Sequence, residues 1–94
     1  MTRAVLPENH TQADSMRLEA MRALETEVHA CMLCALAAGR SHAAPGEGNL
    51  NSPVMFVGEG PGFEEDKQGR PFVGRSGQYL TEVLRKVGIE RSEV

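Results

Sequence analysis

The feature that most constrains the fold is a run of four apolar residues, Val54 to Val57, between Pro53 and Gly58. Four consecutive apolar positions without polar alternation are typical of a strand that is buried on both faces, as strands are in parallel sheets. A parallel sheet cannot consist of one strand, because the backbone groups at its edges need partners. The run therefore predicts an α/β fold whose other strands come from sequence outside these 94 residues or from a second chain.

Two amphipathic segments flank this run and support the α/β class. Apolar residues recur every four positions from Met16 to Val28, which predicts a core-covering helix over about 11–28, with Thr11 or Asp14 as its cap. A second apolar stripe predicts a helix over about 76–87 that ends at Gly88.

The remaining segments are predicted to be irregular. Residues 1–10 show no periodicity and are expected to form a mobile lead-in. Residues 39–53 are rich in Gly, Ser, Asn and Pro, which predicts a loop. No segment has the roughly 18 apolar residues that a membrane span needs, and no secretory signal is visible. A cytoplasmic protein without a membrane partner is therefore expected.

Charge is unevenly distributed, although the net charge is only -3. Residues 67–86 carry five positive side chains and one negative side chain. Such a segment can form a rim that contacts phosphates, or simply a solvated helix face with ordinary salt bridges.

The two cysteines form a Cys-x-x-Cys motif, Cys31 to Cys34, for which several interpretations stay open. The pair can be half of a zinc site, with His29 and His42 as nearby donors, or half of an iron–sulfur site that needs two more thiolates. A thioredoxin-like redox motif is disfavoured, because the pair follows a helical pattern instead of opening a helix. Two buried, inert cysteines are the remaining alternative.

A glycine-rich loop, G-E-G-P-G-F-E-E-D, follows the apolar run at residues 58–66. It has neither the dinucleotide-binding nor the Walker spacing, and its four carboxylates would repel phosphate. The glycines let backbone groups approach a flat ligand, and Glu59 is placed to position a water molecule or to act as a general base. A tight turn with solvated acids explains the same residues. Phe72 is either a core plug or a platform on which a base stacks.

Taken together, these residues closely resemble a known family. The run G-E-G-P-G-F-E-E-D-K-Q-G-R-P-F-V-G-R-S-G-Q-Y-L, residues 58–80, is similar to the first motif region of the family 4 uracil-DNA glycosylases. The upstream elements that also match are Cys31, Cys34, Leu36, Arg40 and residues 45–49. The resemblance extends over residues 28–94, and residues 11–94 are accordingly identified as the N-terminal part of such a domain.

The resemblance implies a three-layer α/β/α sandwich with a mainly parallel central sheet, and hydrolysis of the N-glycosidic bond of uracil in single- or double-stranded DNA. It implies that the backbone at Glu59, Gly60 and Pro61 contacts the flipped uracil and that Glu59 lies near the attacking water. Glu65 would lie against the C5 edge of the base and reject thymine, and Phe72 would stack on the ring. Taking the base out of the duplex has an energetic cost that is lowest for weakly paired bases.

The resemblance further implies that Cys31 and Cys34 are two of the four ligands of a structural [4Fe–4S] cluster, with zinc as the alternative. Three elements that follow in the family do not occur in these 94 residues: an Asn-bearing strand, two further cysteines and a His-Pro-Ser motif. A missing C-terminal segment or a second chain is therefore expected to complete the pocket and the cluster, and the chain alone is expected to be inactive. A non-catalytic module that binds metal and DNA is the alternative function, and a redox protein is the third.

Overall fold

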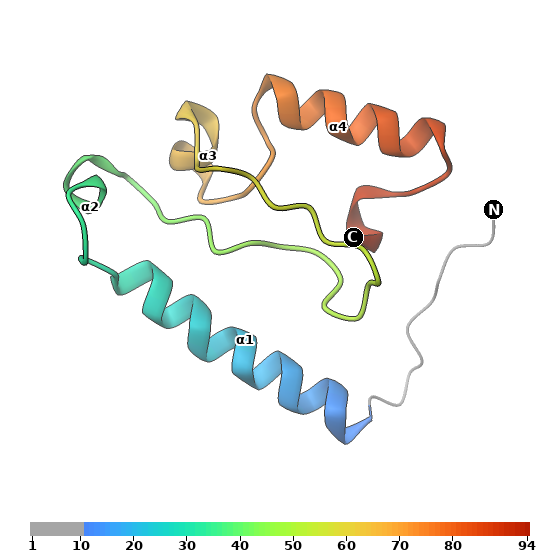
Figure 1. Ribbon diagram of the computed structural model, residues 1–94, viewed down its shortest axis with the longest axis horizontal. Helices are drawn as coiled ribbons and strands as arrows, with labels where there is room; N and C mark the ends of the chain where they lie inside the picture. The colour runs from blue at the N-terminus through green and yellow to red at the C-terminus, as the bar shows by residue number, and fades with distance from the viewer. Residues whose placement is uncertain (1–10) are drawn as a thin grey trace.

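The computed structural model describes residues 11–94, so the lead-in predicted for residues 1–10 lies outside the described residues. Four α-helices and one short 3-10 helix make up the regular structure. They are α1 (Gln12–Ala30), α2 (Leu36–Gly39), α3 (Phe63–Gln68), α4 (Arg75–Lys86) and η1 (Arg91–Glu93). Figure 1 shows α1 along one side of the molecule and α3 and α4 along the other, with irregular chain running between them.

Helix α1 confirms the first predicted helix and extends it by two residues at its C-terminal end. Both predicted caps act together, because the Asp14 amide donates to Thr11 Oγ1 at 3.1 Å and the Thr11 amide donates to Asp14 Oδ2 at 3.2 Å. This reciprocal pair is a capping box. The core-covering role is not seen, since none of the residues of α1 is buried and Met16 is 62% exposed.

Helix α4 confirms the second predicted helix, including its end at Gly88. Gly88 has a φ of 82°, a left-handed conformation that glycine adopts without steric cost. The Ile89 amide donates to the Leu84 carbonyl at 2.9 Å and the Gly88 amide donates to the Arg85 carbonyl at 3.0 Å, which is the Schellman pattern. Leu84 is one of the two buried apolar side chains in the described part of the chain.

The segment predicted to be a strand, residues 54–57, forms no strand within residues 11–94. A strand requires a paired neighbour, and the described segments provide none. As a result, Met55 and Val57 are 82% and 83% exposed instead of buried. The predicted loop over residues 58–66 is also partly wrong, because its acidic half forms α3. Gly62 caps this helix, and three carboxylates in the first turn favour it through the helix dipole.

The described residues have little apolar core, which consists of Ala43 and Leu84. The molecule measures 43 × 34 × 17 Å, and its radius of gyration is 15.0 Å, larger than the roughly 12 Å of a compact domain of this length. Of the described elements, only α4 and η1 pack directly against each other. The three-layer sandwich therefore stays a prediction. None of the helices within residues 11–94 combines the length and the apolar composition that a bilayer-spanning segment requires.

Candidate functional site

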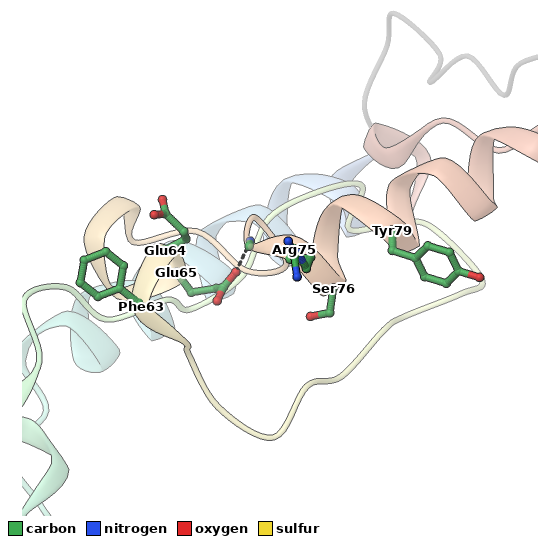
Figure 2. A pocket seen from close by; sticks show the side chains of 7 residues that line it. Phe63, Glu64, Glu65, Arg75, Ser76 and Tyr79 are labelled. Carbon is green, nitrogen blue, oxygen red and sulfur yellow. Dashed lines mark hydrogen bonds between the residues drawn. The ribbon is translucent and has the colours of Figure 1, made fainter.

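The carboxylate of Glu65 joins the glycine-rich loop to the start of α4. It accepts backbone N–H bonds from Gly62 at 3.0 Å and from Val73 at 2.9 Å, and a third bond from Gly74. Figure 2 marks the bond to Gly74. These bonds, the one from Gly74 above all, hold the pKa of Glu65 below its usual value of 4.5, because they stabilise the charged form. The carboxylate of Glu65 is thus ionised, and it links two segments that the sequence predicted to share a site.

Phe72 lies directly against the first residue of the glycine-rich loop. A Cβ placed on Gly58 would stand 3.3 Å from the Cζ atom of the Phe72 ring, so only a glycine leaves room for this approach without displacement. Phe72 is half-buried, and it has a φ of 52°. This left-handed conformation is rare for a bulky residue and is maintained by surrounding contacts where it occurs. The structure therefore places the predicted stacking residue against Gly58, which directly precedes the predicted backbone contacts at residues 59–61.

Arg91 contacts Phe72 from the C-terminal side, and no sequence pattern singled it out. Its Nη1 donates to the Phe72 carbonyl at 3.0 Å and to Thr81 Oγ1 at 3.1 Å, and its Nη2 donates to the Pro71 carbonyl at 2.8 Å. The guanidinium also stands over the Phe72 ring, 5.6 Å from its centroid, within the range of a cation–π contact. No local pattern marks such a residue, because it lies 19 positions after Phe72.

Gly77 supports Phe72 from the side of α4, and this residue was also missed. It is buried within the helix, and a Cβ at this position would stand 2.1 Å from the carbonyl carbon and oxygen of Phe72. Real side chains do not approach backbone so closely. A signal was available in the sequence, since a glycine inside a helical pattern costs about 1 kcal/mol relative to alanine and therefore calls for a packing reason.

Glu59, Gly60 and Pro61 form an exposed bend. A Cβ on Gly60 would meet nothing within 4 Å, so the backbone here is open. The carboxylate of Glu59 forms no hydrogen bond or ion pair with any residue from 11 to 94. The structure therefore leaves this part of the predicted site accessible to a ligand and to water.

An open hollow lies between α3 and the start of α4 (Figure 2). In this view Phe63 and Tyr79 lie at its two ends, with Glu65, Arg75 and Ser76 between them. Of the residues predicted to bind substrate, only Glu65 lines this hollow. The bend at 59–61 and the Phe72 ring are therefore separate from it.

Two polar links attach the loop before the apolar run to α3 and to the residues that follow it. The carboxylate of Asp66 accepts the backbone N–H of Ser41 at 2.8 Å and that of His42 at 3.3 Å. The Ser41 bond above all lowers the pKa of Asp66 below 3.8. Arg70 forms a bidentate pair with Glu47, at 2.8 and 2.9 Å, and its hydrogen bond lowers the pKa of Glu47 below 4.5. These carboxylates thus hold the loop as charged groups at neutral pH.

Cys31 and Cys34 are free thiols at the C-terminal end of α1, and Cys34 is exposed. Within residues 11–94, no three His, Cys, Asp or Glu side chains gather in a way that would hold a metal ion. His29 and His42 are therefore not assembled with the cysteines into the zinc site that was considered. Arg40 donates to the carbonyls of Cys31 at 2.7 Å and His29 at 3.2 Å, which fixes the backbone next to the first thiol.

Comparison with known proteins finds the same similarity over most of the chain. The family model of the uracil DNA glycosylase superfamily matches residues 45–94. The type-4 uracil-DNA glycosylase of Thermotoga maritima is 53% identical over 78 residues, which are 83% of this chain and 41% of that protein. Its counterpart in Sulfurisphaera tokodaii is 44% identical over 82% of this chain and 36% of its own length. The Pyrobaculum aerophilum enzyme is 52% identical over 68% of this chain and 33% of its own. The chain thus spans well under half the length of these curated relatives.

Proposed function

The chain belongs to the uracil DNA glycosylase superfamily, and on this basis we propose that it forms part of a type-4 enzyme that removes uracil from DNA. The reaction is hydrolysis of the N-glycosidic bond, which leaves an abasic site. The observation that carries the proposal is the position of the Phe72 ring, half-buried against Gly58 at the start of an open glycine backbone. A flat base needs this combination of a ring to stack on and backbone groups to bond to.

The bend at Glu59, Gly60 and Pro61 would contact the edge of a uracil that has left the duplex. Glu59 would orient the attacking water and take its proton as the water oxygen bonds to C1′ and the bond from C1′ to N1 of uracil breaks, so that uracil leaves with the bonding electrons. Its carboxylate has no competing partner among the described residues. Glu65 would stand at the C5 edge of the base, and its backbone bonds would keep it from moving aside for the methyl group of thymine.

The chemistry of the donor set fits half of an iron–sulfur site, because Cys31 and Cys34 are two free thiols at the Cys-x-x-Cys spacing. The other two ligands would come from outside the described residues, and zinc stays the alternative metal. A bound cluster would crosslink the end of α1 to those other ligands. In the same way, residues 54–57 would become a strand of the α/β/α sandwich by pairing with further strands. A DNA substrate implies an intracellular location.

The direct test is a glycosylase assay on a uracil-containing oligonucleotide, with the thymine oligonucleotide as control. It uses this chain and the same chain extended through the coding sequence downstream of Val94. We expect the extended chain to release uracil and to leave an alkali-labile site. An extended chain that is folded but leaves uracil in place would overturn the proposal. Salt-sensitive DNA binding without base release, together with bound metal, would identify the alternative metal-binding DNA-binding module.

Substitutions of Phe72 test the stacking role separately. Phe72→Leu keeps an apolar side chain but removes the aromatic face, and Phe72→Tyr keeps the face. Because stacking on one base contributes about 1–3 kcal/mol, we expect Phe72→Leu to slow single-turnover release by about 5- to 150-fold. Phe72→Tyr should remain within about threefold of the parent rate, since the stacking face is retained. Equal rates for both variants would contradict the platform role.

A further inference from the structure

We infer that Arg91 is the positioning residue for the Phe72 platform: it fixes the backbone and one face of the ring, so that uracil stacks on the opposite face. This inference rests on the proposed function, in which Phe72 receives the base. The contacts by which Arg91 positions the ring do not depend on the proposed function.

Arg91 binds three groups at once. Its two terminal nitrogens reach the carbonyls of Pro71 and Phe72 and the hydroxyl of Thr81, at distances from 2.8 to 3.1 Å. Thr81 lies on α4 and Arg91 on η1, and these are the two elements that pack directly against each other in the described chain. The planar guanidinium therefore ties the turn at residues 71–72 to both α4 and η1.

These bonds maintain an uncommon backbone conformation at Phe72. Phe72 has a φ of 52°. This backbone conformation is unfavourable for any residue with a side chain, and it persists only where surrounding contacts support it. Arg91 provides that support by bonding the Phe72 carbonyl, while the bare backbone of Gly77 accommodates the same carbonyl from α4. A relaxed φ would rotate the ring away from Gly58.

Arg91 occupies one face of the Phe72 ring. An aromatic ring has two faces, and the Arg91 guanidinium stands over one of them at 5.6 Å from the centroid. The edge of the ring, at Cζ, approaches Gly58. A base that contacts the glycine backbone and stacks on Phe72 must therefore use the face opposite Arg91. In this arrangement Arg91 positions the ring and does not itself contact the DNA.

The test compares Arg91→Lys with Arg91→Met in the extended chain. Lysine keeps the positive charge but lacks the planar fork, and methionine removes both. If Arg91 acts through geometry, both variants should lower the single-turnover rate by about 5- to 50-fold with little change in DNA affinity. If Arg91 instead contacts a phosphate, Arg91→Lys should restore the parent rate, and this result would overturn the inference. Arg22→Met on α1 is the matched control for loss of an arginine, because the Arg22 side chain has no partner among the described residues.

A double-substitution cycle separates positioning from general support of the fold. A residue that acts through Phe72 should have little further effect once the ring is gone. We therefore expect Arg91→Met to change the base-release rate by less than about twofold in the Phe72→Leu background. A loss of the same size in both backgrounds would show that Arg91 supports the fold only.

A second readout does not depend on activity. The chain contains three phenylalanines, so the ring signals of Phe72 can be assigned by NMR from their disappearance in Phe72→Leu. Arg91→Lys should shift these signals in the protein without DNA, while Arg22→Met should not. If the parent protein releases no uracil and the Phe72 signals still shift, the proposed function fails and the positioning of the ring stands. If the signals do not shift, the positioning fails whatever the activity.

Discussion

Substitution of Gly77 by alanine tests how closely α4 and Phe72 are packed. The added Cβ would stand 2.1 Å from the carbonyl carbon and oxygen of Phe72 and 2.5 Å from its Cα. Ordinary van der Waals contact begins at 3.4 Å, so α4 and the turn must separate by about 1.3 Å, and no side-chain rotation can relieve the overlap. The same movement would stretch the bond from Arg91 to Thr81, which is 3.1 Å long, beyond hydrogen-bonding range.

Three terms give the expected magnitude of the change in local stability. Overpacking of this kind typically costs about 1–3 kcal/mol, and the upper end applies because backbone atoms are involved. Loss of the Arg91 hydrogen bond adds about 1 kcal/mol. The higher helix propensity of alanine returns about 1 kcal/mol. The net destabilisation is therefore about 2–3 kcal/mol, although Gly→Ala in a helix is normally stabilising.

Native-state hydrogen exchange measures this quantity locally and needs no cooperative melting transition. The amides of residues 78–84 should exchange about 30- to 140-fold faster in Gly77→Ala, since each 1.4 kcal/mol is a factor of ten. Gly39→Ala is the matched control, because Gly39 also lies in a helix and a Cβ there would meet nothing within 4 Å. Unchanged or slower exchange in Gly77→Ala would refute the close approach of α4 to Phe72.

The Glu47–Arg70 pair should contribute stability that is complete above pH 4.5 and is lost as the pH falls through the lowered pKa of Glu47 in the folded chain. An NMR titration should show this pKa returning toward 4.5 in Arg70→Leu, and an unchanged value would contradict the pairing. Asp66→Asn should speed exchange of the Ser41 amide, because a neutral oxygen is a weaker acceptor than a carboxylate; equal exchange would exclude that bond. Cys34→Ser should lower the iron or zinc content of the extended chain, and unchanged metal content would remove Cys34 from the ligands.

The sequence predicted the two long helices correctly because their signals are local. The cap at Thr11 and Asp14 and the stop at Gly88 each depend on residues within one turn of the helix end. The acidic segment from Phe63 was predicted as a loop, although carboxylates after a glycine N-cap favour a helix start through the dipole. A strand at residues 54–57 would require pairing with another segment, and a local pattern cannot provide that.

For the site, the sequence named candidate residues but not the contacts that hold them. Phe72 was named as a plug or a platform, and the structure adds Gly58 against its edge and Arg91 over one face. Neither contact has a periodicity or a motif of its own. Glu65 was assigned to the base edge, whereas its carboxylate also bonds three backbone amides. That second role depends on a turn whose geometry exists only in the folded chain.

Because the described residues have little apolar core, polar contacts hold the residues of the candidate site in position. With two buried apolar side chains in the described residues, hydrophobic burial cannot fix the position of a loop here. Fixed geometry must then come from directional bonds, and the carboxylate of Glu65 and the guanidinium of Arg91 each bind three groups around the turn that carries Phe72. Both act over short range and need no sheet. The bonds that position the platform lie within residues 62–91, so the platform does not require the sheet that we propose for residues 54–57.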